Sequence, residues 1–183
     1  MSTGDRHRWD QRYAERELGP AGEMSPPPIF AACEEWLPRA GLALEIACGR
    51  GQAALWLAAR GMQVDAVDIS PVAIGQAQAV LAQSDDAKRV RFEVFDLDHG
   101  LPAGPPCALL LCLNFRDARL DSLMLQRLAP GGILIISTLS DVGAVCHSPF
   151  CAPAGELRRA FAALELLDDG EREGRAWLIG RRR

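Results

Sequence analysis

Two glycines and one aspartate form the strongest chemical pattern in the sequence. Gly49 and Gly51 follow a short apolar run over residues 42–47, and Asp68 stands at the end of the next expected strand. Glycine at both positions allows a tight turn and lets a ligand approach the backbone. The helix expected after the turn offers free N–H groups to that ligand. An aspartate so placed can accept hydrogen bonds from both hydroxyls of a ribose, so the pattern predicts a nucleotide-type cofactor.

The glycines alone do not select the cofactor. Gly49-x-Gly51-x-x-Ala54 also satisfies the loose dinucleotide pattern G-x-G-x-x-G/A. Both NAD and S-adenosylmethionine bind at such a turn, beyond the carboxyl ends of parallel strands. A glycine turn that binds no ligand is the remaining alternative.

The segments around this turn predict an α/β fold. Residues 52–60 are rich in alanine and leucine and predict a helix that Gly61 ends. Apolar runs predict strands, and helical periodicity or capping residues predict the helices between them. The expected strands are 42–47, 63–67, 90–95, 107–113 and 133–138, and the expected helices are 71–83, 119–128 and 153–161. Residues 164–167 and 176–179 are expected to flank Asp168-Asp169-Gly170 in a closing hairpin, which makes about seven strands.

Residues 1–40 are expected to precede the α/β core of residues 41–183 within a single domain. Trp9, Arg12 and Tyr13 have helical spacing. They can dock a short amphipathic helix on the core. They can equally close over the cofactor as a lid, with the aromatic rings stacked near it and Arg12 reaching a carboxylate. Both interpretations stay open.

The composition is that of an ordinary globular domain of 183 residues, with 49% hydrophobic residues and a net charge of −4. Nothing in it predicts a nucleic-acid surface, because the terminal arginines 181–183 form only a short solvated run. No apolar run is long enough to span a membrane, and the polar N-terminus is unlike a signal peptide. The sequence therefore predicts a cytoplasmic protein without a membrane partner, and it carries no signal for an oligomeric state.

The six cysteines lack any C-x-x-C pair, and four lie in apolar segments. This pattern predicts buried free thiols in a reducing compartment. Cys146 and His147 with Cys151 match no zinc spacing, so no metal site is predicted.

Several segments, in this order, resemble the class I S-adenosylmethionine-dependent methyltransferases. They are E-I-A-C-G-R-G, V-D-A-V-D-I-S, F-D-L-D and L-A-P-G-G-I-L-I-I-S, and the resemblance runs from Trp9 to Ile179. W-D-Q-R-Y-A and A-P-A-G-E-L are similar to small methyltransferases of the tellurite-resistance type, with thiopurine methyltransferases a more distant likeness. The resemblance implies a doubly wound seven-stranded sheet, Rossmann-like, with a reversed seventh strand.

The resemblance also implies where S-adenosylmethionine would lie. Its methionine part would be lined by Glu45, Ala47, Cys48, Gly49 and Gly51, its ribose by Asp68 and Ile69, its adenine by Asp96 and Leu97, and its sulfonium by Leu113 and Asn114. If residues 1–20 close as the lid that their residue types allow, Trp9, Arg12 and Tyr13 would cover the cofactor. One departure from the usual G-x-G-x-G is Ala47 in place of the first glycine; its methyl narrows the space without abolishing the site.

Methyl transfer from a sulfonium needs orientation and a dry site, and a soft nucleophile needs no strong general base. We therefore expect a small-molecule acceptor such as a thiolate or a selenium or tellurium oxyanion. The candidate residues around it are Asn114, Arg116 and His147, with the pocket closed by the N-terminal segment, residues 114–116 and the 139–152 loop. Arg116, together with Arg12 and His147, would steer the acceptor.

Other interpretations stay open for these residues and for the chain. Arg116 can instead pair with Asp117 or Asp121 on a helix surface, and His147 can be an ordinary loop histidine. The chain can also be a non-catalytic S-adenosylmethionine-binding regulator or partner subunit. An NAD-binding oxidoreductase is less favoured, because 183 residues leave little room for a separate substrate domain.

Overall fold

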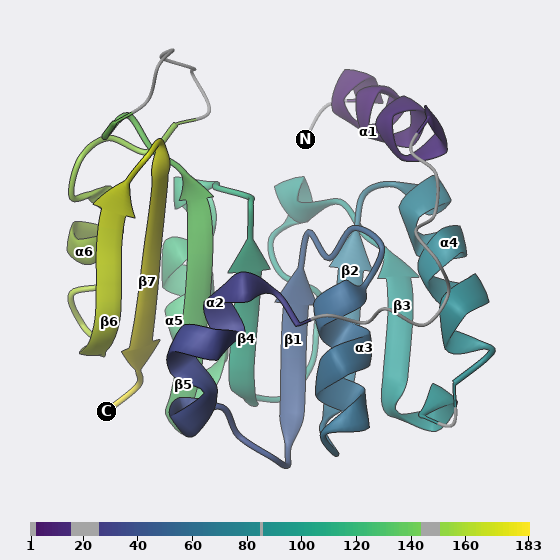
Figure 1. Cartoon of the computed structure of the whole chain (residues 1–183), viewed down its shortest axis with the longest axis horizontal. Helices are drawn as coiled ribbons and strands as arrows, with labels where there is room; N and C mark the ends of the chain where they lie inside the picture. Colours follow the sequence, from purple (N-terminus) through teal and green to yellow (C-terminus); the bar gives the residue numbers. More distant parts are fainter. Residues whose placement is uncertain (1–2, 16–25, 85, 144–150) are drawn as a thin grey trace.

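The computed structural model describes residues 3–15, 26–84, 86–143 and 151–183. Their strands form one seven-stranded sheet in the order β3-β2-β1-β4-β5-β7-β6 (Figure 1). β7 is antiparallel to both of its neighbours, and the other pairings are parallel. The predicted doubly wound sheet with a reversed seventh strand is confirmed.

The elements follow one another as strands alternating with helices until the last two strands. The strands are β1 (Leu42–Ile46), β2 (Gln63–Asp68), β3 (Val90–Val94), β4 (Cys107–Leu113), β5 (Leu128–Leu139), β6 (Glu165–Arg172) and β7 (Arg175–Arg181). The helices are α1 (Thr3–Glu15), α2 (Pro28–Cys33), α3 (Gln52–Ala59), α4 (Pro71–Leu81), α5 (Asp121–Arg127) and α6 (Glu156–Ala160). Short 3-10 helices are η1 (Glu34–Trp36), η2 (Ala87–Arg89), η3 (Leu97–His99) and η4 (Ala118–Leu120).

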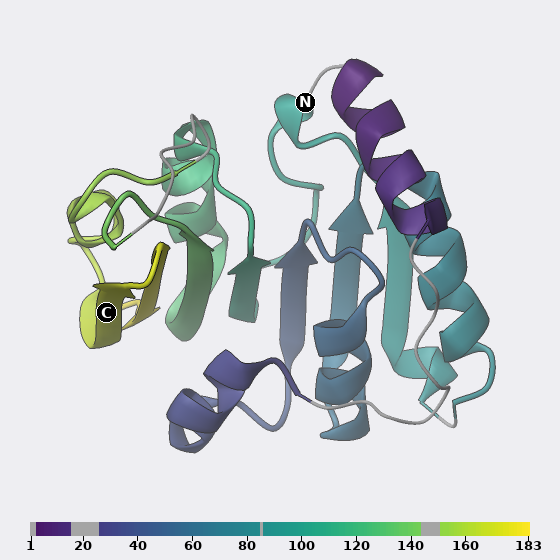
Figure 2. The same cartoon turned by 45° about the horizontal axis from the view of Figure 1, so that its top comes forward.

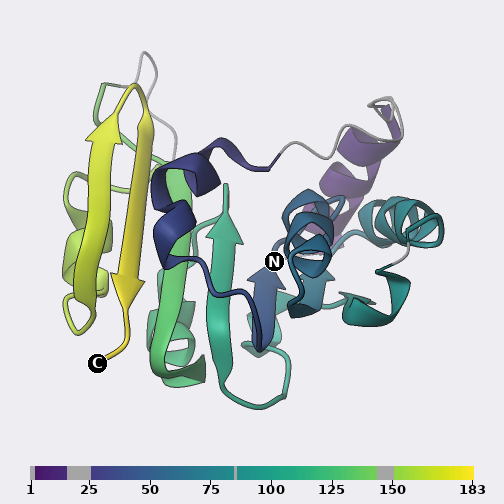
Figure 3. The same ribbon diagram turned by 60° about the horizontal axis from the view of Figure 1, so that its bottom comes forward.

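The sheet separates two buried apolar clusters, one on each face. The central strand β4 supplies both, because successive side chains of a strand point to opposite faces. Leu109 and Leu111 join the cluster that α2, α3 and α4 cover, and Leu110 and Cys112 join the cluster that α5 and α6 cover. Figures 1 and 3 show α2 in front of β4 and β5, with α5 behind the sheet.

The strand order reverses between β1 and β4, so the chain leaves these neighbouring strands in opposite directions. A doubly wound sheet binds its ligands at such a point, outside the carboxyl ends of the strands. Helix α1 lies at this edge and packs against α4 (Figures 1 and 2). The fold therefore places the glycine turn, the ends of β2 and β4, and the N-terminal helix at one edge of the sheet.

The closing hairpin differs from the expectation in the position of its turn. Asp168, Asp169 and Gly170 lie inside β6, and the turn falls at Glu173 and Gly174, which have φ angles of +52° and +74°. A Cβ on Gly170 would lie 2.2 Å from the Trp177 ring across the hairpin. Gly170 therefore leaves room for the indole of Trp177 on the neighbouring strand. The expectation that Gly170 belongs to a turn is wrong.

The other boundaries shift by a few residues. β5 begins at Leu128, ahead of Pro130-Gly131-Gly132, where a break was expected, because a bulge in the β4–β5 ladder lets Leu128 pair with Cys107. Cys33, Cys48, Cys107 and Cys112 are buried free thiols. In the described part of the chain, no helix is long and apolar enough to cross a membrane.

Candidate functional site at the carboxyl edge of the sheet

Three residues of the turn after β1 have a left-handed backbone conformation. Ala47, Gly49 and Gly51 have φ angles of +53°, +54° and +69°. The expected effect of Ala47 on the site was a loss of space; the structure adds a conformational cost, on the order of 1 kcal/mol relative to glycine. The Gly51 N–H donates to the Cys48 carbonyl at 2.9 Å, which closes the turn and leads the chain into α3.

The two glycines serve different purposes. A Cβ on Gly49 would lie 2.7 Å from the Tyr13 hydroxyl, on the open side of the turn. A Cβ on Gly51 would lie 2.3 Å from the Phe92 ring, on the core side. The close approach of Tyr13 explains Gly49 and packing against Phe92 explains Gly51, while space for a ligand at Gly49 stays a prediction.

Asp68 joins the glycine turn to the end of β2. Its Oδ2 accepts a hydrogen bond from the Gly49 N–H at 2.8 Å, and its Oδ1 accepts one from the Ser70 N–H at 2.9 Å. The side chain is 6% exposed. Burial raises the pKa of Asp68, while the two N–H donors act in the opposite direction. The carboxyl group therefore fixes the turn and keeps further acceptor capacity at the edge of the sheet.

Glu45 lies beneath the same turn as a buried acid with a spare oxygen. Its side chain is 4% exposed, and its Oε2 has no hydrogen-bond partner. Burial raises the pKa of Glu45 to about 8, against the lowering effect of the Ala54 N–H, and the nearby Asp68 carboxylate adds to the rise. Two buried acids side by side favour a cation or a hydrogen-bond donor as ligand.

Helix α1 is held at this edge by side chains of the core that donate hydrogen bonds to one of its backbone carbonyls. The Tyr13 carbonyl accepts hydrogen bonds from Arg50 Nη2 at 3.0 Å and from Gln76 Nε2 at 3.2 Å. The Ser70 hydroxyl donates to the Asp10 carboxylate. No local sequence pattern marks Asp10, Arg50 or Gln76, because their partners are distant in the chain.

The aromatic residues of α1 lie together as their spacing predicted. The Trp9 and Tyr13 rings stack with centroids 5.9 Å apart, and the Arg12 guanidinium lies 5.2 Å from the centre of the Trp9 ring. Burial, with the nearby Asp68, raises the pKa of Tyr13 to about 12. Tyr13 therefore keeps its proton at neutral pH and presents a hydroxyl above Gly49. Docking of α1 on the core is confirmed, and its movement as a lid stays a prediction.

Two residues are turned into the core, Ile69, expected at the ribose, and Leu97, expected with Asp96 at the adenine ring. Leu97 and Ile69 are each 2% exposed, so their main-chain atoms are what they offer at the edge. Asp96 Oδ1 accepts the Asp98 N–H at 3.0 Å and caps the turn after β3. The spatial grouping of these residues with Asp68 agrees with the expectation, while their contact with adenine stays a prediction.

At the end of β4 the chain passes through Asn114, whose φ angle is +59°. The Asn114 N–H donates to the Ser137 carbonyl at 2.8 Å, and Asn114 Oδ1 accepts from Arg175 Nη1 at 2.7 Å. Leu113, just before it, is half-buried against the α3-side cluster. No local sequence pattern marks Arg175, which begins the reversed strand β7; β5 lies between β7 and β4 in the sheet.

Arg116 requires a correction to the expected steering role. Its side chain is 8% exposed and pairs with Asp121 at 2.6 Å and with Glu156 at 2.5 Å. The alternative of an ion pair with Asp121 is therefore confirmed, and two carboxylates already neutralise the guanidinium. His147 lies outside the described residues, as do residues 144–150 of the 139–152 loop.

The comparisons with known proteins agree with this geometry. Residues 43–132 match a family model described as a methyltransferase domain. TehB from Haemophilus influenzae superposes with a TM-score of 0.71 at 16% identity, over 97% of this chain and 67% of that one. An S-adenosylmethionine-dependent methyltransferase from Mesorhizobium loti superposes with a TM-score of 0.70 at 16% identity, over 87% of this chain and all of the other. The chain has the class I methyltransferase fold.

The same methyltransferase fold also carries other chemistry. The [4+2]-cyclase SpnF superposes with a TM-score of 0.67 at 17% identity, over 84% of this chain and 79% of that one. A search of curated protein sequences finds no match to this chain. The fold is therefore shared with proteins of different activities, and function has to be argued from the site.

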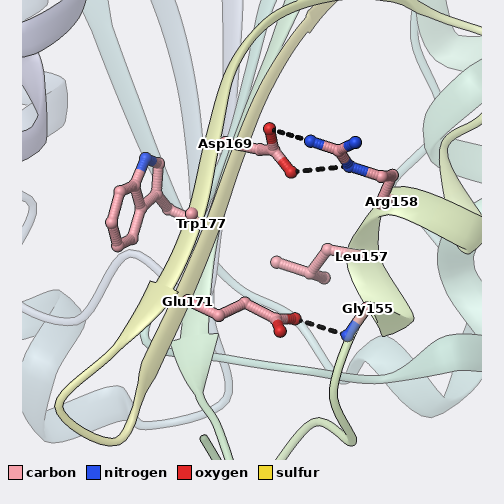
Figure 4. A pocket seen from close by; sticks show the side chains of 7 residues that line it. Gly155, Leu157, Arg158, Asp169, Glu171 and Trp177 are labelled. Carbon is pink, nitrogen blue, oxygen red and sulfur yellow. Dashed lines mark hydrogen bonds and ion pairs between the residues drawn. The ribbon is translucent and has the colours of Figure 1, made fainter.

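A separate pocket of about 280 Å³ lies between α6 and β6 of the methyltransferase fold. Figure 4 shows Asp169 paired with Arg158 and Glu171 accepting from the Gly155 N–H. Both acidic side chains of this pocket are thus already partnered. Among the buried acids that the structure describes, Glu45, under the glycine turn, has a carboxyl oxygen without a hydrogen-bond partner, which makes the carboxyl edge the better candidate site.

Proposed function

We propose that the chain is an S-adenosylmethionine-dependent methyltransferase that acts on a small molecule. The observation that carries the proposal is the pair of buried carboxyl groups at the glycine turn, Glu45 with an unpartnered oxygen and Asp68 with acceptor capacity left. The match of residues 43–132 to a methyltransferase domain supports it.

The residues present fit this cofactor group by group. The unpartnered Oε2 of Glu45 suits the ammonium of the methionine part, because a buried carboxylate gains most from a cationic partner. Asp68 suits the two ribose hydroxyls. The protonated Tyr13 hydroxyl above Gly49 suits the carboxylate of the methionine part.

NAD fits the same turn less well. Its pyrophosphate is anionic and would lie on the glycine turn, directly above Glu45 and Asp68. A pyrophosphate there would keep Glu45 protonated, as it is in the ligand-free protein at neutral pH, so it would gain no ion pair, and it would meet the Asp68 carboxyl as a neighbour of like charge. The electrostatics of the turn therefore favour the cationic cofactor, which the glycine pattern alone does not decide.

The bound cofactor supplies an electrophilic methyl group on a sulfonium. The residues of this chain orient and shield that group. Leu113 ends β4 and Asn114 follows it, beside the expected position of the methyl group, and α1, which is held through hydrogen bonds to the Tyr13 carbonyl, would exclude water from above. We propose a soft acceptor, such as a thiol or a reduced selenium or tellurium oxyanion, because it reacts without a general base.

We further propose that the chain is one domain, with residues 1–40 acting as the cover of the 41–183 core. The buried free thiols of Cys33, Cys48, Cys107 and Cys112 suit a reducing compartment such as the cytoplasm. Binding of the cofactor without turnover of any acceptor would instead favour a regulatory or partner role.

Asp68→Ala is the variant that tests the cofactor. We expect S-adenosylmethionine to bind the wild-type protein and to bind Asp68→Ala more weakly by about a factor of ten or more, because a charge-assisted hydrogen bond and the anchor of the turn are both lost. The measurement is calorimetric titration, with NAD(H) titrated in parallel.

Asp65→Ala is the matched control for this titration. Asp65 lies on the same strand, but its carboxylate pairs with Arg91 at 3.0 Å away from the turn. Equal losses in both variants would contradict the anchoring role of Asp68. Binding of NAD alone would overturn the choice of cofactor, and binding of neither ligand would overturn the proposed function.

A further inference from the structure

We propose that Arg175 is a specificity-determining residue that selects an acceptor with an anionic group beside an apolar part. The inference rests on the proposed methyl transfer and names the class of its acceptor. It moves the recognition of the acceptor away from Arg116, whose charge two carboxylates already neutralise.

The position of Arg175 is the first reason. It is the first residue of β7, the strand whose reversed direction brings its N-terminal end to the carboxyl edge of the parallel strands. There its Nη1 donates to Asn114 Oδ1 at 2.7 Å. A guanidinium therefore lies next to Asn114, the residue that follows β4, on the acceptor side of the expected cofactor position.

The charge of Arg175 is the second reason. Among the residues that the structure describes, Arg175 has only the neutral amide of Asn114 as a polar partner, and the nearby Glu173 forms no ion pair with it. Arg116, Arg119 and Arg158 all pair with aspartates or glutamates. A guanidinium has five N–H donors in a fixed fork, so Arg175 keeps donors that match a carboxylate or another oxyanion.

The surface beside Arg175 is the third reason. Leu139 is the cross-strand partner of Arg175 in the antiparallel β5–β7 pair, so both side chains lie on the same face. Leu139 is 44% exposed, an apolar side chain open at the edge of the sheet. Trp177, two residues further along β7, shares this face, and Figure 4 shows its ring on the opposite side of the strands from Leu157. The Arg172 guanidinium lies 5.1 Å from the centre of the Trp177 ring, so the open apolar area that the Arg175 guanidinium borders is that of Leu139.

Asn114 gains a positioning role from the same contact. Its Oδ1 faces the guanidinium, so its amide N–H₂ group is directed away from Arg175 as a donor. Arg175 thus holds Asn114 in one orientation and binds the anionic group of the acceptor with its remaining donors.

The test uses a matched pair of probes, 4-mercaptobenzoate and its neutral amide, 4-mercaptobenzamide. Both carry a thiol on an aromatic ring, and they differ in one negative charge. Each probe is titrated by calorimetry into protein saturated with S-adenosylhomocysteine. We expect the wild-type protein to bind the benzoate at least about tenfold more tightly than the amide, because a hydrogen bond between two charged groups contributes about that much affinity.

The variants assign this preference to Arg175. Arg175→Gln should remove the preference for the benzoate. Arg175→Lys should retain part of it, because lysine keeps the positive charge but lacks the forked N–H donors of the guanidinium. Arg181→Gln, at the other end of β7 and paired with Glu165 at 3.4 Å, should behave like the wild type. Thermal unfolding of each variant checks that the fold is intact.

Each other outcome overturns the inference. Equal affinity of the wild-type protein for the two probes, a preference that survives in Arg175→Gln, or no binding of either probe by protein that binds S-adenosylhomocysteine would each do so. Failure to bind S-adenosylhomocysteine and S-adenosylmethionine would overturn the proposed function itself, and the prior cofactor titration separates that case from failure of the acceptor class.

Discussion

Arg116→Ala is expected to lower the free energy of unfolding by about 3 kcal/mol, because removal of one partner leaves buried charges unpaired. The guanidinium is 8% exposed and joins the turn after β4 to α6. Its two partners, Asp121 and Glu156, are 17% and 23% exposed and would face each other without it. Denaturant unfolding at neutral pH measures the loss.

Arg119→Ala is the matched control, since Arg119 also pairs with two carboxylates, those of Asp98 and Asp117. Its side chain is 68% exposed, so water and salt screen the pairs and we expect little change in stability. Equal losses in the two variants would contradict the importance of burial. Normal stability of Arg116→Ala with a raised KM for the acceptor would instead restore the steering role.

The parts of the fold that could be predicted are those whose signals are local. The strand Cys107–Leu113 was expected over the same residues, because an uninterrupted apolar run is typical of a strand buried on both faces. Ser70 and Pro71 were expected to begin a helix, and the Ser70 hydroxyl accepts the Ala73 N–H at 3.1 Å. In both cases the residues that decide the structure are neighbours in the sequence.

The parts that could not be predicted depend on residues far apart in the chain. Gly170 lies inside a strand because Trp177 occupies the space above it. The partners of Arg116 include Glu156, and the partner of Asn114 is Arg175, each on an element that only the folded sheet brings near. A pattern of residue types shows that an arginine is present but not which carboxylate it meets.

The candidate site was predictable in part for the same reason. The turn and Asp68 form a local strand–turn–helix–strand unit, and the structure joins them through the Gly49 N–H. The fastening of α1 by Arg50 and Gln76 has no such local signal. The resemblance to methyltransferases placed Glu45 in the site, but only its burial shows that it carries a shifted pKa.

Glu45→Gln is expected to change the pH dependence of stability by several kcal/mol. The pKa of Glu45 rises from its ordinary value of 4.5 to about 8 through burial, with smaller opposing and supporting effects from the Ala54 N–H and Asp68. Because the folded-state pKa is raised, its contribution to stability is fully present below about pH 4.5 and is lost as the pH rises through about 8. The shift corresponds to about 5 kcal/mol.

Glutamine has the shape of the protonated acid, so the variant and the wild type should have similar stability at acid pH. Above pH 8 the variant should be the more stable, because it carries no buried charge. The readout is the free energy of unfolding of Glu45→Gln minus that of the wild type, measured from acid pH to above pH 8. The other titrating groups are the same in both proteins, so their contributions cancel in this difference. Glu93→Gln, at an exposed position on β3, should give no such slope. A difference that does not change with pH would contradict the shifted pKa.

The Glu45 carboxyl group should also couple cofactor binding to the release of a proton. At neutral pH the ligand-free protein holds Glu45 protonated, since its pKa is about 8. A cationic ammonium at the unpartnered Oε2 would favour the ionised form, so binding of S-adenosylmethionine should release a proton. Calorimetry in buffers of different ionisation enthalpy measures that proton, and Glu45→Gln should abolish it. Cofactor binding without proton release would place the ammonium elsewhere and leave Glu45 as a buried structural acid.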